Sequence, residues 1–326
     1  MGDPLVRPRI TAIAIVPGER ELGLDELAAM HGASNATIER LLGGRSVCVS
    51  GRTPLDLGVD AAKLCLAKAR VDAKQVGAVL WTGFVPPAVT RPSMYIQHAV
   101  GATQANPVQL VFNCTELLSG LQVARAMIRD EPALDRVLLV GGVSYGEAFP
   151  KRTRVPIKEK SNETLFSDCG VALLVERRGP GAELSSFGNG SVGSLWDYLE
   201  RMAAPPVHDD PRGPLPTMLQ ALLYSKPAHD RALSTALRDA GVAASDLDHV
   251  LFPREPGGLE RQMMRQMQLD PGKLCDPPGG PTHTGVSDPF IGLEHLMGGA
   301  ARSGAHILVA SRTIGLMRCA VVRIVE

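Results

Sequence analysis

Short apolar runs, many of them rich in β-branched residues, alternate along the chain with longer segments in which apolar positions recur at helical spacing. Runs of this length are typical of buried strands, and spacings of three or four residues are typical of helices. We therefore expect strands at residues 10–16, 77–83, 108–112, 136–142, 170–176, 249–252, 306–311 and 319–325. We expect helices at residues 60–71, 115–130, 229–242 and 289–304. This alternation predicts an α/β protein whose sheets are covered on both faces.

The same pattern of segments occurs twice. Residues 61–83 align with residues 231–254 after a one-residue slip, and residues 117–127 then align with residues 289–299. Two later strand segments match in the same order. Four matches in one order indicate an internal duplication.

The duplication divides the chain into three parts. We expect a first half at residues 1–177 and a second half at residues 217–326. Residues 178–216 are rich in Gly and Pro, which favours a loop-like excursion between the halves.

Composition narrows the range of functions. Apolar residues make up 44% of the 326-residue chain and charged residues 21%, which is typical of a protein with a large core. The 34 Lys and Arg residues balance the 34 Asp and Glu residues, and no basic run occurs, so we expect no nucleic-acid or membrane partner. No apolar stretch is long enough for a bilayer span or a signal peptide. Six scattered cysteines without ligand spacing indicate reduced thiols, a cytoplasmic location and no metal site.

Cys114 is the candidate nucleophile, because it lies on the turn between an expected strand and an expected helix. The helix dipole and the free backbone N–H groups at such a turn stabilise a thiolate, which is the reactive form of cysteine. Most cysteines are instead small buried hydrophobes. We interpret the other five in this way: Cys48, Cys65, Cys169, Cys275 and Cys319. By the same reasoning, the Met-rich segment at 259–269 is expected in the core rather than in an acyl pocket.

The duplication also proposes a partner for this thiol. The alignment pairs Cys114 with Val286, within residues 279–290. Two halves packed about a pseudo-two-fold axis would bring this segment to face Cys114. His283 in this segment is the best-placed base or hydrogen-bond donor, with Asp288 close by in sequence. The alternative is that His283 is a purely structural histidine.

Five segments, in order, carry a family resemblance over nearly the whole chain. They are SMYIQHAVGA (93–102), FNCTELLSGLQVA (112–124), LFSDCGVALLVE (165–176), RALSTALRDAGVAASDLDHVLFP (231–253) and THTGVSDPFIGLEHL (282–296). In these segments the chain resembles the thiolase superfamily, and within it ketoacyl-ACP synthase III and its acyl-transferring relatives. The resemblance implies a duplicated fold of two βαβαβ halves in α/β/α/β/α layers.

The resemblance also implies a mechanism. An acyl group from acyl-CoA or an acyl carrier protein would load onto Cys114 as a thioester, with no further cofactor. The N–H groups of Cys114 and Gly315 would form the oxyanion hole, because Gly315 in TIGLM matches a family glycine. A small-molecule or carrier-bound acceptor would then take the acyl group. A homodimer formed through strands of the first half is implied as well.

The chain departs from the family at two site positions. The usual histidine falls at Pro253 or Arg254, and the usual asparagine falls at His283. Decarboxylative condensation needs two donors to hold an enolate, whereas acyl transfer to a hydroxyl or an amine needs only a base such as His283. Arg254 is a permanent cation that either binds a carboxylate or phosphate or is solvated at a helix start, and we favour solvation. Asp288 and Glu116 are candidate accessory carboxylates.

Three functions remain open at this point. The leading hypothesis is an acyltransferase that works through Cys114 in specialised-metabolite biosynthesis of the polyketide or antibiotic type. The first alternative is a condensing enzyme that forms a C–C bond by decarboxylative or direct Claisen chemistry. The second alternative is a non-catalytic partner subunit of an active ketosynthase.

Overall fold

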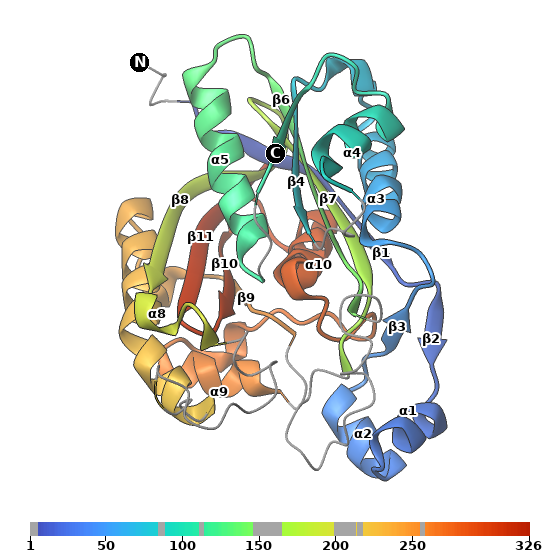
Figure 1. Ribbon diagram of the computed structural model, residues 1–326. Coiled ribbons are helices and arrows are strands. Elements are labelled where there is room, and N and C mark those ends of the chain that lie inside the picture. Colours follow the sequence, from blue (N-terminus) through green and yellow to red (C-terminus); the bar gives the residue numbers. More distant parts are fainter. Residues whose placement is uncertain are drawn as a thin grey trace.

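The computed structural model describes residues 6–83, 89–110, 114–145, 165–198, 213, 218–254 and 258–326. Within these ranges no helix has the length and apolar character that a bilayer crossing requires. The larger of the two described sheets has nine strands in the order β5-β4-β6-β7-β1-β8-β11-β10-β9 (Figure 1). Its strands are β1 (Arg9–Pro17), β4 (Ala78–Gly83), β5 (Asn106–Gln109), β6 (Arg136–Val143), β7 (Cys169–Glu176), β8 (Gly181–Ser191), β9 (His249–Leu251), β10 (His306–Thr313) and β11 (Leu316–Val325).

The predicted duplication is visible in this strand order. Outward from the central β1–β8 pair, the first half continues through β7, β6 and β4, and the second half continues through β11, β10 and β9. The directions of the strands also repeat. The β4–β6 pair is parallel and the β6–β7 pair antiparallel, just as the β9–β10 pair is parallel and the β10–β11 pair antiparallel. The two halves therefore share one topology, except that β5 has no counterpart among the described strands of the second half.

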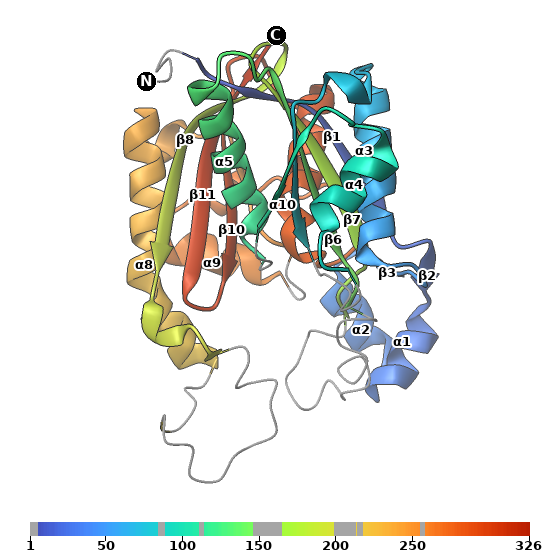
Figure 2. The ribbon, with the colours of Figure 1, turned by 45° about the horizontal axis from the view of Figure 1, so that its top comes forward.

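The helices lie in three layers around the two halves of the sheet (Figures 1 and 2). Helices α3 and α4 cover the outer face of the first half, and α8 and α9 cover the outer face of the second half. Helices α5 and α10 lie between the halves, in the central core. This arrangement confirms the α/β fold class. The described α-helices are α1 (Leu24–His31), α2 (Asn35–Leu42), α3 (Pro54–Ala69), α4 (Pro92–Val100), α5 (Glu116–Asp130), α8 (Met218–Ala240), α9 (Leu259–Gln266) and α10 (Asp288–His295).

The central core is built from both halves. Leu117 and Leu121 of α5 and Phe290 and Leu293 of α10 are fully buried in one apolar cluster with the inner faces of the strands. Burial of each such side chain stabilises the fold by roughly 1.5–3 kcal/mol relative to exposure. A further small sheet of β2 (Arg20–Leu22) and β3 (Val47–Val49) carries α1 and α2 at the edge of the first half (Figure 1).

The predicted excursion at 178–216 is wrong in its first part, because β8 lies within it and pairs with both β1 and β11. The glycines that favoured a loop serve close packing instead. A Cβ at Gly188 would lie 1.9 Å from the carbonyl oxygen of Ala232, and one at Gly190 would lie 1.8 Å from that of Ala228. Helix α8 can therefore approach β8 only where side chains are missing. Residues 199–212 and 214–216 lie outside the described residues.

Other predicted elements differ mainly in length. Helix α8 begins eleven residues before the predicted start at 229. It contains Pro227 in its interior, although proline usually marks a helix boundary, so the sequence pattern points to a later start. Strand β5 ends at Gln109, and residues 111–112 of the predicted strand lie outside the described residues. Met263 and Met264 of α9 are buried in the outer core of the second half, which confirms the core assignment of the Met-rich segment.

Candidate active site

The candidate nucleophile, Cys114, lies just before Thr115, the N-cap of α5, and its thiol is free and half-buried. The Ser311 hydroxyl donates a hydrogen bond of 2.5 Å to the backbone carbonyl oxygen of Cys114. Arg318 donates from Nε to Oγ1 of the buried Thr115 at 3.3 Å, and its guanidinium lies 3.6 Å from the Glu116 carboxylate. Ser311 and Arg318 are directly paired across β10 and β11. This pair of facing residues in the β10–β11 hairpin, which we call the rung, therefore binds the turn that carries Cys114.

Sequence reasoning missed both residues of this rung. Ser311 and Arg318 flank the TIGLM segment, which was used only for its glycine. The sequence pattern predicts the two strands, but Cys114, which Ser311 contacts, lies about 200 positions away along the chain. No local signal indicates such a contact.

The candidate base, His283, is only 6% exposed and forms a hydrogen bond from Nδ1 to Oδ2 of Asp288. The Asp288 carboxylate is buried at the first position of α10. Its Oδ1 accepts bonds of 2.6 Å from both the N–H and the hydroxyl of Thr284, and its Oδ2 accepts a bond of 2.8 Å from the N–H of Arg254. A carboxylate with these donors has little freedom to move.

The ionisation of Asp288 fixes the tautomer of His283. Burial acts to raise the pKa of Asp288, but the charge of His283 and the hydrogen bonds from His283 and Thr284 outweigh burial and lower that pKa. An ionised carboxylate only accepts hydrogen bonds, so Nδ1 of His283 carries the hydrogen. In the neutral imidazole, the lone pair is then on Nε2, as a general base requires.

The connection between β6 and β7 packs against the His283 ring. The Phe166 ring meets the imidazole edge to face, with ring centroids 4.5 Å apart, and also contacts the Tyr145 ring. The N–H of Ser167 donates to the carbonyl oxygen of His283 at 2.8 Å. Asp168, a residue of the family-like motif, accepts N–H bonds from Tyr145 and Ser50 and so has a structural role.

The helix that follows Cys114 and the segment that follows His283 are in contact. The short helix η8 (Gly285–Ser287) follows His283 and packs against α5, β6 and β7. Val286 of η8 is fully buried in the same cluster as Leu117 and Leu118 of α5. The two halves thus bring the start of α5 and the start of α10 to one region of the central layer.

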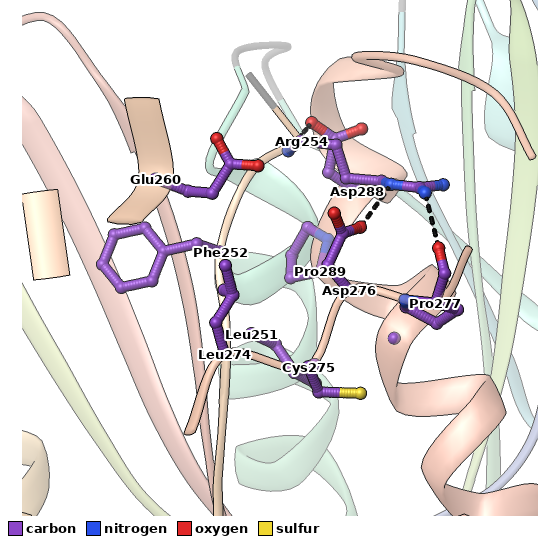
Figure 3. Close-up of a pocket in the computed structure, with 11 residues that line it drawn as sticks. Leu251, Phe252, Arg254, Glu260, Leu274, Cys275, Asp276, Pro277, Asp288 and Pro289 are labelled. Atoms are coloured by element: carbon purple, nitrogen blue, oxygen red, sulfur yellow. Dashed lines mark hydrogen bonds and ion pairs between the residues drawn. The ribbon is translucent and has the colours of Figure 1, made fainter. Parts of the chain in front are cut away.

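Arg254 corrects the expectation of a solvated cation, because it is only 3% exposed. Its guanidinium donates to Asp276 and to the backbone carbonyls of Pro277, Gly279 and Pro281. Figure 3 shows the cavity beside it, which has a volume of about 10 Å³. A space of that size holds at most one water molecule, so Arg254 does not meet a substrate carboxylate or phosphate there.

Gly315 also departs from its expected role as an oxyanion-hole donor. It has φ +76° in the tight turn between β10 and β11, a conformation that favours glycine. Its N–H donates to the Ser225 hydroxyl of α8 at 2.9 Å, and its carbonyl oxygen accepts from the N–H of Val192. Because the N–H of Gly315 donates to Ser225, it is not available to an oxyanion near Cys114.

Glu116 faces Arg318, so its carboxylate is part of an ion pair. Burial raises the pKa of all five other cysteine thiols, to about 12 for Cys65 and Cys169, which favours the unreactive thiol. Across the described ranges, His, Cys, Asp and Glu form no group of three or more that could hold a metal ion.

Comparisons with known proteins agree with this architecture. No protein-family model matches the chain. Hydroxymethylglutaryl-CoA synthase from Methanopyrus kandleri is 23% identical over 308 residues, which cover 91% of this chain and 81% of the relative. β-Ketoacyl-[acyl-carrier-protein] synthase III from Bartonella bacilliformis is 23% identical over 178 residues, and this match spans about half of each chain (53% and 52%).

Solved structures match nearly the whole chain. The crystal structure of 3-oxoacyl-(acyl carrier protein) synthase III from Pseudomonas aeruginosa has a TM-score of 0.79 at 20% identity, over 98% of both chains. A structure of OleA from Xanthomonas campestris with bound lauric acid and lauroyl-CoA has a TM-score of 0.77 at 17% identity, over 98% of this chain and 99% of that one. The chain therefore has the fold of these proteins.

Proposed function

We propose that this chain is a ketoacyl-synthase-III-like member of the thiolase superfamily, and that it is an acyltransferase with a covalent acyl-cysteine intermediate. Cys114 accepts an acyl group from acyl-CoA or an acyl carrier protein and passes it to a hydroxyl, an amine or a carrier-bound acceptor. The observation that carries the proposal is the buried His283–Asp288 pair, which flanks the short helix η8 that packs against α5, the helix following Cys114. The similarity to OleA with bound lauroyl-CoA supports a thioester donor.

In the first step, the sulfur of Cys114 attacks the thioester carbonyl of the donor. The new bond joins carbon to Sγ, the bond to the carrier sulfur breaks, and the thiol proton ends on the departing thiol. The positive end of the α5 dipole faces the turn that carries Cys114. The Ser311 bond to the carbonyl oxygen of Cys114 fixes the peptide plane at this turn, and with it the direction of the neighbouring N–H groups.

In the second step, the hydroxyl or amine of the acceptor attacks the acyl carbonyl. Nε2 of His283 takes the acceptor proton, and the Asp288 carboxylate stabilises the imidazolium that forms. The carbon–sulfur bond then breaks, and the proton passes to the Cys114 sulfur. The pair thereby returns to its starting state, with no change in redox state.

The residues favour transfer over decarboxylative condensation. The usual family histidine falls at Pro253 or Arg254, and Arg254 donates to a loop, so His283 is the one remaining donor at the two usual positions. One donor holds an enolate poorly, whereas one base is enough for transfer. This difference also favours a role in specialised-metabolite biosynthesis, of the polyketide or antibiotic type, over the initiation of fatty-acid synthesis.

Direct Claisen condensation is the second candidate. The similarity to hydroxymethylglutaryl-CoA synthase over 91% of the chain favours it. In that reaction His283 would take a proton from carbon rather than from oxygen or nitrogen.

The test is intact-protein mass spectrometry after incubation with a panel of acyl-CoA and acyl-carrier-protein thioesters. We expect a mass gain that is absent in Cys114→Ala and persists in His283→Ala, where onward transfer is slowed strongly but stays measurable. Release of carbon dioxide from a malonyl thioester, or a β-keto product, would establish condensation instead. Absence of an adduct with every donor would leave the non-catalytic partner subunit, and co-purification with an active ketosynthase would then be the next measurement.

We also propose a homodimer that works in the cytoplasm. The described sheet ends at β5, whose outer edge has no partner strand and carries exposed residues Asn106 and Gln109. A second copy of β5 would continue the sheet and cover this edge. All six cysteines are free, as expected for a reducing compartment. Light scattering after gel filtration should give twice the chain mass of 34.6 kDa, and a monomer would refute the dimer.

A further inference from the structure

We propose that Arg254 is a positioning residue, which fixes the His283–Asp288 pair by holding both the Asp288 carboxylate and the loop that leads to His283. The inference rests on the proposed function only where it treats His283 as the base. The contacts that support it do not depend on the reaction.

The guanidinium of Arg254 forms hydrogen bonds with one loop, residues 276–281. Nε donates to Asp276 at 3.0 Å, Nη1 donates to the carbonyl of Pro281 at 3.0 Å, and Nη2 donates to the carbonyls of Pro277 at 2.9 Å and Gly279 at 2.7 Å. Figure 3 shows the bonds to Asp276 and Pro277. Pro281 is only two residues before His283, so the loop delivers the imidazole to its place.

The shape of this loop is fitted to the cation. Gly279 and Gly280 have φ +72° and +71°, values that glycine adopts without strain. A Cβ at Gly280 would lie 3.3 Å from Nη1 of Arg254, closer than is comfortable. The two glycines thus let the backbone curl around the guanidinium and turn its carbonyls inward.

The backbone of Arg254 reaches the same pair from the other side. Its N–H donates to Oδ2 of Asp288 at 2.8 Å, the same oxygen that bonds Nδ1 of His283. One residue therefore restrains the base through the chain and its carboxylate through a direct bond. A shift at Arg254 moves both partners.

Arginine suits this task better than the alternatives. Its planar fork has five N–H donors, whereas lysine has three on a flexible stem and histidine has at most two. The side chain here serves four acceptors, so neither lysine nor histidine can replace it.

The neighbouring Arg45 provides a matched control. It is buried in the same charged cluster and forms ion pairs with Glu260, at 2.7 Å, and with Asp276. Arg45→Gln therefore removes a similarly buried cation that shares a carboxylate with Arg254. If only the charge of the cluster mattered, the two variants would behave alike.

The first experiment is proton NMR of the His283 Nδ1–H, which gives a downfield signal when it is bonded to a carboxylate. We expect this signal in the wild-type protein and in Arg45→Gln, and its loss in Arg254→Gln and in the reference variant Asp288→Asn. This readout needs no turnover, so it tests the positioning even if acyl transfer fails altogether. An unchanged signal in Arg254→Gln would overturn the proposal.

The second experiment is a cycle of single and double variants with onward acyl transfer as the readout. Arg254→Gln should lower the rate at least tenfold in the wild-type background but less than threefold in the His283→Ala background. Equal losses in both backgrounds would mean a role unrelated to His283 and would refute the inference. If Arg254→Gln does not fold, Arg254→Lys and Asp276→Asn take its place, with the same expected pattern.

Discussion

The starts of α5 and α10 are equivalent positions in the two halves, but they differ in their exposure to solvent and in their chemical groups. Cys114 precedes α5 with a half-buried thiol, whereas its counterpart Val286 is fully buried. Each helix begins with a carboxylate. Glu116 is partly exposed and forms an ion pair with Arg318, whereas Asp288 is buried and forms a hydrogen bond with His283. The duplicated fold thus supplies two equivalent helix starts, one open for a reacting group and one closed around a base.

Each half also braces the helix start of the other. Ser311 and Arg318, from β10 and β11, hold the turn before α5. Phe166 and Ser167, from the connection between β6 and β7, hold His283. The candidate site is shared between the halves, so neither half could form it alone.

The strongest test of the comparison exchanges the carboxylate at each helix start for an amide. Asp288→Asn should lower acyl transfer by about 100-fold or more, because the amide offers one acceptor oxygen to four donors and no longer orients the base. Glu116→Gln should change the rate by less than about fivefold, since a partly exposed ion pair contributes only about 1 kcal/mol. Single-turnover transfer measures both. Equal losses would show that the two ends are not specialised.

The next test asks whether the two outer helices pack alike. A Cβ at Gly170 of β7 would lie 2.1 Å from the carbonyl oxygen of Leu57 in α3, and one at Gly190 of β8 would lie 1.8 Å from that of Ala228 in α8. Gly170→Ala and Gly190→Ala should each destabilise the fold by about 3 kcal/mol, since backbone must move. Gly193→Ala, with open space at its Cβ, is the control. Urea unfolding measures all three, and a stable Gly190→Ala would contradict close packing at β8.

A second buried histidine sharpens the contrast with His283. His229 of α8 is 5% exposed, its Nε2 has no partner among the described residues, and burial together with the charge of Arg312 lowers its pKa to about 4. Between about pH 4 and pH 6.5, His229 is therefore protonated in the unfolded chain but neutral in the folded protein. Stability should fall by up to about 3 kcal/mol as the pH drops from about 6.5 to about 4.

The control for this pH dependence is His229→Gln, which should reduce the slope of the stability profile between those limits. The lowered pKa of Asp288 makes no contribution there, because a carboxylate of that kind loses its stabilising effect only as the pH falls from about 4 through its folded pKa. Urea unfolding at pH 7 and pH 5 gives the slope. An identical slope in the variant would show that His229 is not the titrating group.

The smallest expected effect concerns the brace on the nucleophile turn. Ser311→Ala removes one hydrogen bond to the carbonyl of Cys114, which contributes about 1 kcal/mol. Alkylation of Cys114 by iodoacetamide should slow a few-fold, because the turn is less well held. Ser311→Thr retains the hydroxyl and should restore the rate. If both variants react alike, the hydroxyl has no role in the reactivity of this thiol.

The sequence by itself determined the fold class, the duplication and the position of Cys114 at a strand-to-helix turn. These properties are local or repeated: the spacing of apolar residues reports the element, and four matches in order report the second copy. The pairing of Cys114 with Val286 followed from the repeat alone, and it led to the segment that contains His283 and Asp288.

Only the tertiary structure decided which partner each polar group meets. Arg254 could be solvated, bind substrate or hold a loop, and the third outcome depends on carbonyls more than twenty residues away. The N–H of Gly315 meets Ser225, and the hydroxyl of Ser311 meets the turn at Cys114. The amino-acid type fixes what a group can donate or accept, but long-range packing selects its partner, and no local pattern carries that choice.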